Sequence, residues 1–243
     1  MKIVAIIQAR MGSTRLHGKV LKNLCGQTVL ARVVNRTRRA QLAAEIVVAT
    51  SVLPADDDIL RECDRLAVPC FRGDEGDVLD RYYHAAQQFA ADAVVRITSD
   101  CPLIDPELID ATVRAFLDEM ADYATNSLTI TYPRGLDVEV FTADALACAW
   151  QQAKQTYQRT HVTPYLYEHP EQFKIESLTC EESFGHFRWT LDTQEDWELI
   201  EIIYNRFSGR DDFRWREVLA LMKSEPELTD LNSHVQQKAI TEG

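Results

Sequence analysis

The densest set of side chains able to do chemistry lies in residues 8–21, Q-A-R-M-G-S-T-R-L-H-G-K-V-L, directly after a short apolar run. Within ten positions this stretch offers cations, hydroxyls and glycines: Arg10, Gly12, Ser13, Thr14, Arg15, Gly18 and Lys19. Backbone N–H groups beside fixed positive charges suit a polyphosphate. The stretch is not a Walker A loop, because Val20 follows Lys19 where serine or threonine is required. The alternatives are a phosphate-binding loop and a solvated basic loop, and the position after a strand favours the first.

Carboxylates follow two later apolar runs in the same way. Asp100 comes after residues 93–98, and Asp192 comes directly after residues 187–191. Because ligands of open α/β sheets bind at the carboxyl ends of strands, both side chains are expected at the edge where the basic loop begins. Hard oxygen ligands suit Mg²⁺. The sequence therefore predicts that Asp100 and Asp192 bind a metal ion.

Helix capping is the alternative role for these acidic residues. Asp105 is better placed than Asp100 to cap the helix that begins near Pro106, whereas Asp192 competes with Thr193 to begin a helix over residues 195–206. Residues 56–58 are three aspartates and formally contain the D-x-D metal motif of glycosyltransferases. They precede a helix rather than end a strand, so we interpret them as the acidic first turn that a helix dipole favours.

The elements that would position these groups alternate between strands and helices in the first half. Apolar runs predict strands at residues 3–8, 45–50, 68–71 and 93–98, and helical spacing predicts helices at 28–39, 56–66, 77–90 and 106–120. Residues 3–8 lack polar alternation, as is typical of a strand covered on both faces. Repeated strand–helix units imply right-handed crossovers and a mainly parallel sheet between two layers of helices, an α/β fold.

The regular alternation of predicted strands and helices ends after residue 122. Strands are predicted at residues 123–127, 136–141, 173–178 and 187–191, and helices at 143–154, 195–206 and 214–222. We interpret this half as the completion of the sheet, with a small lobe inserted at about residues 128–180. The prediction is one domain over residues 1–223, followed by a polar tail over 224–243.

Composition excludes several classes of protein. The 243 residues carry 26 Lys+Arg against 38 Asp+Glu, a net charge of −12, which argues against nucleic-acid binding. Nine of the cations and none of the acids fall within residues 1–44, which favours a small anionic ligand. The helical spacing places Arg32, Arg36, Arg38 and Arg39 on the solvent side or near the end of a helix. No apolar run is long enough to span a membrane, and six scattered cysteines without zinc spacing suggest reduced thiols in a cytoplasmic protein.

Residues 6–21 resemble the signature loop of the sugar-acid cytidylyltransferases, which include the enzymes that make CMP-activated Kdo and CMP-activated sialic acids. Further similar segments follow in order at residues 71–73, 77–83, 96–105, 132–139, 161–165 and 188–193. The likeness is greatest to the spore-coat polysaccharide biosynthesis branch. It implies a Rossmann-like, three-layer nucleotidyltransferase fold of the glycosyltransferase-A type and the transfer of CMP from CTP to a sugar acid, with release of pyrophosphate.

The resemblance also implies roles for individual residues. Arg10, Lys19 and Asp100 would be catalytic, and the nucleotide would be bound by Ala9, Arg10, Gly12, Ser13, Arg15, Lys19, Arg72 and Asp80. The sugar acid would contact residues in the later segments, namely Arg134, Glu139, His161 and Arg188. Asp100 and Asp192 would hold Mg²⁺, the implied cofactor. The segment at about 128–180 would form the interface of a homodimer. The enzyme would be similar to an acylneuraminate cytidylyltransferase, and its product would serve surface polysaccharide synthesis.

Two other functions stay open at this point. A glycosyltransferase that uses a nucleotide sugar has a similar α/β core and a similar need for metal, although the missing strand-end D-x-D argues against it. A catalytically silent nucleotide-binding partner in a polysaccharide pathway would bind CTP without turnover. The combination of Arg10, Arg15, Lys19, Asp100 and Asp192 argues against a silent protein.

Overall fold

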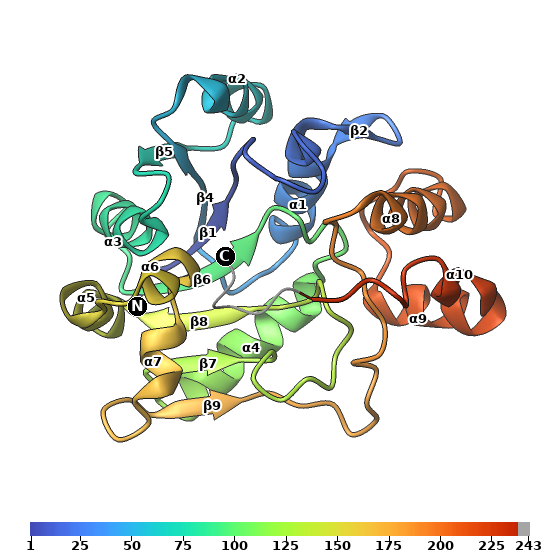
Figure 1. Ribbon diagram of the computed structural model, residues 1–243. Helices are drawn as coiled ribbons and strands as arrows, with labels where there is room; N and C mark the ends of the chain where they lie inside the picture. Colours follow the sequence, from blue (N-terminus) through green and yellow to red (C-terminus); the bar gives the residue numbers. More distant parts are fainter. Residues whose placement is uncertain (238–243) are drawn as a thin grey trace.

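A computed structural model describes residues 1–237, and these residues form three layers, with helices on both faces of one large sheet (Figure 1). Within them the sheet has seven strands in the order β5-β4-β1-β6-β8-β7-β9. Their bounds are β1 Ile3–Gln8, β4 Glu45–Ser51, β5 Cys70–Gly73, β6 Ala93–Thr98, β7 Tyr123–Thr125, β8 Glu139–Thr142 and β9 Ile175–Ser177. Of these strands, β8 alone runs antiparallel to its neighbours. The predicted α/β class with a mainly parallel sheet is confirmed.

β1 lies inside the sheet because its side chains are apolar on both faces. Ile3, Ala5 and Ile7 pack into one hydrophobic cluster, and Val4 and Ile6 pack into another, since alternate side chains of a strand point to opposite faces. β1 pairs in parallel with β4 on one side and with β6 on the other. The carboxyl ends of these three strands therefore meet at one edge of the sheet.

Helices cover the two faces in separate groups. The cluster on one face includes residues of α1, α2 and α4, and the cluster on the other includes residues of α3, α5 and α7. The bounds are α1 Val29–Thr37, α2 Asp57–Leu66, α3 Val78–Gln88, α4 Pro106–Asp118, α5 Ala143–Gln152, α6 Thr156–His161 and α7 Pro164–Glu168. In the described part of the chain, no helix combines the length and the apolar character that crossing a membrane requires.

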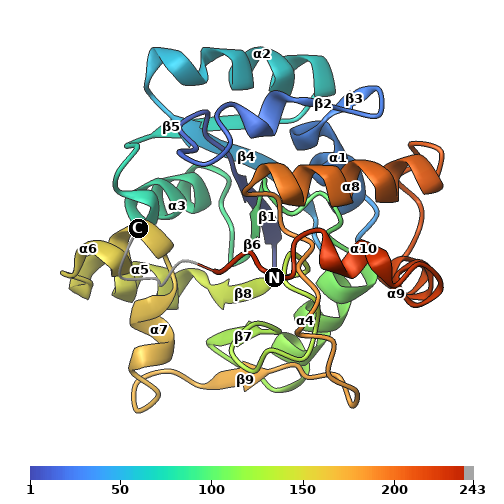
Figure 2. The ribbon, with the colours of Figure 1, turned by 45° about the vertical axis from the view of Figure 1, so that its right-hand side comes forward.

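A third group of helices packs beside the sheet. It consists of α8 (Gln194–Arg206), α9 (Trp215–Ser224) and α10 (Glu227–Asp230), which stand together at one side of the molecule (Figure 2). Their apolar faces share a separate hydrophobic cluster with Trp189 and Leu191. The segment from residue 224 was predicted to be a polar tail, but its first part forms α10, and Leu228 is 5% exposed. Residues 238–243 lie outside the described part.

The strand predicted at residues 187–191 is wrong. This segment is extended, but its only ladder contact among the described residues is a single bridge between Arg134 and Arg188. Arg134 N donates to Phe187 O at 3.0 Å, and Trp189 N donates to Arg134 O at 2.7 Å. Gly135, at φ +96°, passes so close that an added Cβ would lie 2.5 Å from Thr190 N. An apolar run indicates that a segment is buried, but not that it pairs with a strand. Trp189 and Leu191 are buried without belonging to the sheet.

The predicted lobe at residues 128–180 is not a separate unit. β8 pairs directly with β6, and β9 pairs with β7, so this segment supplies two strands to the main sheet. α5 and α6 pack against α3. The strands are only three or four residues long, and their partners lie far away in the sequence, so the local pattern suggested an interruption rather than a continuation of the sheet.

Two arginines of α1 contradict the predicted solvent-facing position. Arg32 is 1% exposed and Arg36 is 0% exposed. Arg36 donates to the backbone oxygens of Ile104, Leu103, Asp211 and Phe213 at 2.7–3.4 Å. Arg32 donates to the backbone oxygens of Leu24, Cys25 and Gly209 and to the Asp211 carboxylate. Both arginines therefore fasten the segments around α8 and α9 to the sheet domain.

Candidate active site

The basic loop leaves β1 and folds back on itself. Ala9 N donates to Ala49 O at 3.0 Å and extends the contact between β1 and β4 by one residue. Met11 O accepts hydrogen bonds from both Ser13 N (2.8 Å) and Gly18 N (3.2 Å), which closes the loop. Gly18 has φ +63° and begins a short 3₁₀ helix, Lys19–Leu21. The loop therefore returns Lys19 to the end of β1, where its side chain is held.

Asp56 anchors this loop to the end of β4. Its carboxylate accepts Met11 N at 2.7 Å and also accepts the backbone N–H and hydroxyl of Ser51 at the end of β4. Asp56 is 2% exposed, whereas Asp57 and Asp58 lie in the first turn of α2. The first-turn interpretation is confirmed for Asp57 and Asp58, whereas Asp56 precedes α2 and fixes the loop.

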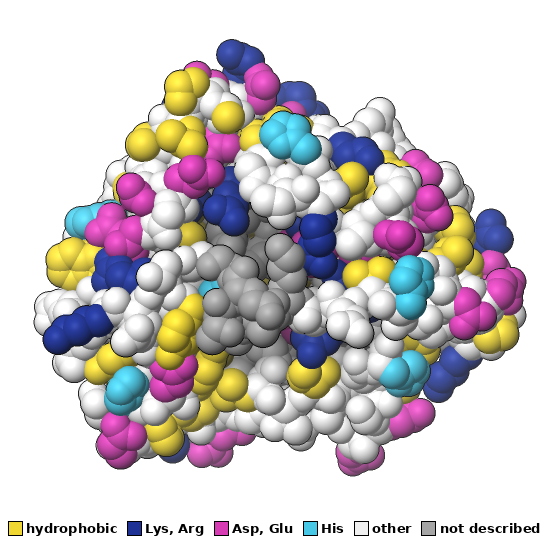
Figure 3. Space-filling view, viewed as in Figure 1, with side chains coloured by type: hydrophobic (Ala, Val, Ile, Leu, Met, Phe, Trp, Pro, Cys, Tyr) yellow, Lys and Arg dark blue, Asp and Glu magenta, His cyan; other side chains and the backbone are white. Residues whose placement is uncertain are grey.

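A cavity of about 360 Å³ opens at the carboxyl ends of β1 and β6. Figure 3 shows Lys and Arg side chains bordering the centre of this face of the molecule. The cavity brings together nine of the predicted site residues: Ala9, Arg10, Gly12, Ser13, Arg15, Lys19, Asp100, His161 and Asp192. The loop, two strand ends and α6 thus meet at one place, although they are spread over more than 180 residues of sequence.

Lys19 lies between the two predicted metal-binding carboxylates. Its Nζ donates to Asp100 Oδ2 at 3.0 Å, to Asp192 Oδ1 at 2.8 Å and to Leu191 O at 2.7 Å. Burial acts to lower the pKa of Lys19, but attraction to Asp100 and Asp192 outweighs it and raises the pKa. Burial would raise the pKa of Asp100, yet the Lys19 ammonium and the Thr98 hydroxyl hold it below its ordinary value. Lys19 is therefore charged at neutral pH, and so is Asp100.

Asp192 has two further cationic partners. Arg15 Nη2 and Arg188 Nη2 both lie 2.9 Å from Asp192 Oδ2. Asp192 does not cap α8, because the Thr193 side chain accepts Asp196 N, and the Asp196 side chain accepts Thr193 N in return. The capping alternative is therefore removed for Asp192.

Asp100 is also free of a capping role. Asp105 caps α4 by accepting Glu107 N at 2.8 Å, as the sequence predicted. Asp100 instead binds the extended segment that precedes Asp192 through its backbone, since Asp100 O accepts Leu191 N at 2.8 Å. This contact holds the two carboxylate-bearing segments together.

The donor chemistry of Asp100 and Asp192 fits Mg²⁺. The ammonium of Lys19 contacts one oxygen of each carboxylate, so the two groups are close enough to share a cation. The described residues contain no group of three or more His, Cys, Asp and Glu side chains that could hold a metal alone. Mg²⁺ is commonly held by one or two carboxylates together with substrate phosphates, and that is the arrangement these residues could provide.

Arg72 and Asp80, predicted to bind the nucleotide, do not line the cavity. Arg72 donates to Ser51 O and Leu53 O and pairs with Asp57 at 2.8 Å, which fastens β5 to the start of α2. Asp80 accepts Trp150 Nε1 at 2.8 Å on the outer side of α3. Both side chains hold neighbouring elements together, so this part of the predicted nucleotide site is not supported.

Three of the four predicted sugar-binding residues also lie outside the cavity lining. Glu139 is 7% exposed and accepts Tyr123 Oη at 2.7 Å, and its other oxygen pairs with Arg96. Arg134 takes part in the backbone bridge to Arg188. Arg188 is 6% exposed and reaches the site through Asp192 rather than by facing the cavity. Internal polar contacts account for the side chains of Glu139 and Arg188, and the contacts of Arg134 described here are those of its backbone.

His161 is the predicted sugar-binding residue that lines the cavity. It ends α6, and Arg159 of the same helix donates to Asp77 Oδ2 at 2.7 Å. Asp77 also caps α3 by accepting Asp80 N at 2.9 Å. One carboxylate thus couples the two helices and places the end of α6 over the cavity.

Thr14 of the basic loop also lines the cavity. The remaining residues of the lining were not predicted from the sequence: Gln8, Val20, Val78, Arg81, Thr98, Ser99, Thr160 and Gln237. Arg81 lies in one of the segments that carried the family resemblance and could have been named from it. It is 1% exposed and donates to Asp74 O and Glu75 O. Gln237 had no signal in the sequence, because its contact depends on the path of the chain after α10.

The sheet order, the basic loop after β1 and the carboxylates at two segment ends define a nucleotidyltransferase-type α/β protein. A family model described as cytidylyltransferase matches residues 4–223. The chain belongs to the cytidylyltransferase family.

Three proteins are similar to this chain over nearly its whole length. An uncharacterized protein of Methanocaldococcus jannaschii is 40% identical, over 100% of this chain and 99% of its own length. The spore coat polysaccharide biosynthesis protein SpsF of Bacillus subtilis is 34% identical, over 93% of this chain and 95% of its own. A solved cytidylyltransferase structure from Leptospira borgpetersenii is 32% identical with a TM-score of 0.91, over 98% and 99% of the two chains. Each relative therefore spans nearly the whole chain.

Proposed function

We propose that the protein transfers CMP from CTP to a sugar acid of the nonulosonic or 3-deoxy-ulosonic type and releases pyrophosphate. The observation that carries the proposal is the meeting of Arg10, Arg15 and Lys19 with Asp100 and Asp192 in one cavity of about 360 Å³. A hydroxyl oxygen of the acceptor would form a bond to the α-phosphorus. The bond from the α-phosphorus to the departing pyrophosphate would break, and the hydroxyl proton would be released.

The basic loop would bind the triphosphate. Arg10, Arg15 and Lys19 supply positive charge, while Gly12 and Ser13 bring backbone and hydroxyl donors to the same cavity. Lys19 and Arg15 now pair with carboxylates, and an arriving triphosphate offers them partners of higher charge. Because Asp56 and the closing hydrogen bonds on Met11 O fix the loop beforehand, little ordering remains to be done when the nucleotide binds.

Asp100 and Asp192 would hold Mg²⁺ through their carboxylate oxygens. When bound, the ion would supply positive charge to neutralise the reacting phosphate. Arg188 would keep the Asp192 carboxylate in place, since its guanidinium also binds the buried Asp196 at 2.9 Å. The chain's own part is to present two oriented carboxylates facing the basic loop.

The acceptor would lie beside Thr160 and His161, which line the same cavity from α6. Support for a sugar acid comes from the family resemblance of residues 161–165 and 188–193. The name of the Bacillus subtilis relative refers to polysaccharide biosynthesis, and we propose a surface polysaccharide as the destination of the product. A homodimer through the segment 128–180 is part of the same proposal, supported by the partly exposed Leu128 and Ile130, each 41% exposed.

A pyrophosphate-release assay tests the proposed function. The protein would be mixed with Mg²⁺, each of the four ribonucleoside triphosphates and a panel of 3-deoxy-ulosonic and nonulosonic acids. The expected result is release that requires both CTP and one of the acids. Release with a purine nucleotide and not with CTP would overturn the cytidyl assignment. Release of a nucleoside diphosphate from a nucleotide sugar would favour a glycosyltransferase, and CTP binding without turnover would favour a silent partner.

A further inference from the structure

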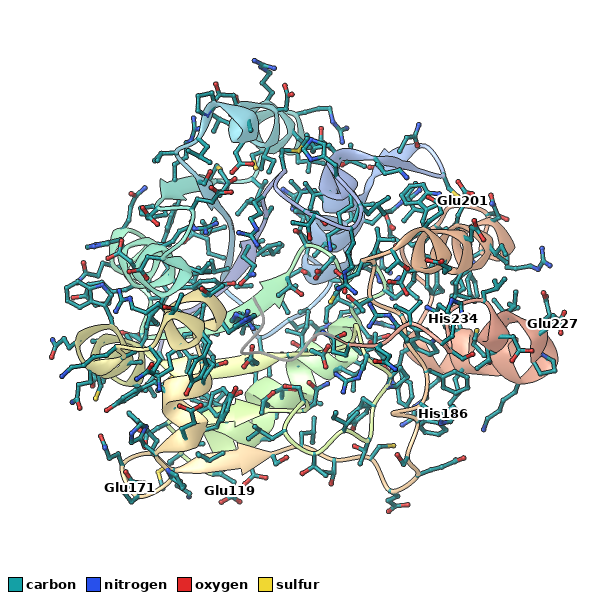
Figure 4. All side chains as sticks on the ribbon, viewed as in Figure 1. Glu119, Glu171, His186, Glu201, Glu227 and His234 are labelled. Atoms are coloured by element: carbon teal, nitrogen blue, oxygen red, sulfur yellow. The ribbon has the colours of Figure 1, made fainter. Side chains whose placement is uncertain are left out.

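The chain beyond the region shared with the family model returns to the active site. The match to that model ends at residue 223, within α9. After α10 the chain continues as a coil, on which Figure 4 labels His234, and the coil leads from α10 towards the centre of the molecule. At residue 237 it reaches the cavity that holds the basic loop and the two carboxylates.

Asn232 fastens this coil to the buried support of the site. It is 3% exposed, and its Nδ2 donates to Arg188 O at 2.9 Å and to Asp196 Oδ1 at 2.8 Å. The same Asp196 oxygen accepts Arg188 Nε at 2.9 Å. Asn232 therefore completes the hydrogen bonding of the Arg188–Asp196 ion pair, whose members are 6% and 0% exposed.

Gln237 accepts a hydrogen bond from the guanidinium of the same arginine, Arg188. Arg188 Nη1 donates to Gln237 Oε1 at 2.7 Å, while Arg188 Nη2 donates to Asp192 Oδ2 at 2.9 Å. One arginine thus connects the C-terminal coil with the carboxylate proposed to hold the metal. Gln237 itself lines the cavity beside Asp192 and Arg15.

We propose that the coil after α10 contributes two residues to the active site, with Asn232 as a positioning residue and Gln237 as a contact for the acceptor sugar acid. This proposal rests on the proposed function. Asn232 acts through Arg188 on the orientation of Asp192. Gln237 presents an uncharged amide, which both donates and accepts hydrogen bonds and suits a polyhydroxylated acceptor, whereas the anionic triphosphate has the cations of the basic loop.

The sequence offers a matched pair of variants for Gln237. Gln236→Ala and Gln237→Ala remove the same side chain from neighbouring exposed positions, of which only residue 237 lines the cavity among the described residues. In the pyrophosphate-release assay, Gln237→Ala is expected to raise KM for the sugar acid about tenfold, with KM for CTP within twofold of wild type. Gln236→Ala should match wild type. Identical KM values for the two variants, or a change confined to CTP, would overturn the assignment of Gln237.

Asn232→Ala tests the positioning role, with Ser233→Ala at the next, exposed position as its control. Asn232→Ala is expected to lower kcat about tenfold and to leave KM for CTP within twofold, because the loss falls on the orientation of Asp192 rather than on the triphosphate loop. A fall in melting temperature with unchanged kcat would show that Asn232 is merely structural and would overturn this role.

Hydrogen exchange separates failure of this inference from failure of the proposed function. In the presence of CMP and Mg²⁺, adding each acid of the panel to the wild-type chain tests contact with the acceptor, and the accepted acid is expected to slow exchange of the backbone amides of residues 231–237 at least fivefold; this measurement needs no turnover. Absence of pyrophosphate release with every acid would count against the function alone. Unchanged exchange in this segment, with protection of Thr160 and His161 by the acid, would show that the acceptor binds without involving the coil and would overturn the inference.

Discussion

The first 44 residues contain two groups of cations that look alike in sequence and differ completely in their surroundings. Arg32 and Arg36 of α1 are 1% and 0% exposed, and most of their partners are backbone oxygens. Arg15 and Lys19 of the basic loop have the carboxylates Asp100 and Asp192 as partners, and those carboxylates line a cavity. The α1 pair joins segments of the fold, and the loop pair faces a place that a ligand can enter.

This difference shows that the hydrogen-bond partners of a buried cation indicate whether it stabilises the fold or serves a ligand site. The fold fixes the position of a backbone oxygen. An arginine that donates to several such oxygens therefore stabilises the folded structure rather than binding a ligand. A carboxylate at a cavity can exchange its cation for a metal ion, and the released cation can bind an incoming anion. We therefore expect changes in the α1 group to appear in stability and changes in the loop group to appear in activity.

The largest expected effect on stability is that of Arg36→Met. It leaves the oxygens of Ile104, Leu103, Asp211 and Phe213 without their donor, and each unsatisfied buried group costs about 1–3 kcal/mol. The free energy of unfolding, measured by urea denaturation, should fall by at least about 3 kcal/mol. Arg39→Met, at an exposed position of the same region, should change it by about 0.5 kcal/mol or less. Equal effects of the two substitutions would break the comparison.

Lys19→Met is the corresponding change in the loop group. Removing one preorganised cation from such a site costs about 10²–10³-fold in kcat. Stability should fall by about 1–3 kcal/mol, less than for Arg36→Met, because Leu191 O loses its buried donor while Arg15 and Arg188 still neutralise Asp192. Lys22→Met, three residues on, is the control, since Lys22 lies over the Trp197 ring at 4.0 Å and outside the cavity lining. A Lys19→Met protein with full activity would remove Lys19 from the proposed chemistry.

Asp56→Asn is expected to change both stability and activity, because Asp56 is buried and also holds the basic loop. Asparagine keeps one oxygen for Met11 N but loses an acceptor for Ser51, which should cost about 1–2 kcal/mol of stability. A looser loop should also raise KM for CTP about fivefold, whereas Asp58→Asn at an exposed position of α2 should leave both quantities unchanged. Lower stability with unchanged KM would show that the Met11 contact does not serve nucleotide binding.

Local patterns in the sequence predicted much of the sheet. The strands at 3–8 and 93–98 have the predicted bounds, because a buried parallel strand is an apolar run that needs no knowledge of its partner. The basic loop and Asp100 were placed correctly together for the same reason, since strand ends of a parallel sheet meet at one edge. Asp192 lines the same cavity but comes from an extended segment outside the sheet. Residues 187–191 show the limit of this argument: burial was predicted correctly, but the pairing that makes a strand was absent.

Other features depended on contacts that no local pattern contains. Polar spacing on α1 could not distinguish a solvated arginine from Arg36, which binds oxygens 67 to 177 residues away. Asp56 contacts a residue 45 positions earlier, and Gln237 contacts Arg188 across 49 positions. Arg72, Asp80, Glu139 and Arg188 were assigned to ligands because they lie in segments that resemble the family, while the internal partners that account for their polar groups could not be read from the sequence.

The most direct test of the account compares Asp100→Asn with Asp118→Asn in the pyrophosphate-release assay with CTP, Mg²⁺ and the accepted sugar acid. Asp100 faces Lys19 in the cavity, whereas Asp118 is exposed at the end of α4. The account predicts that Asp100→Asn stays folded, with a melting temperature near that of wild type, and loses at least about 10²-fold in kcat, while Asp118→Asn is unchanged. Near-normal turnover by folded Asp100→Asn would contradict the claim that the two carboxylates and the basic loop form one nucleotidyl-transfer site.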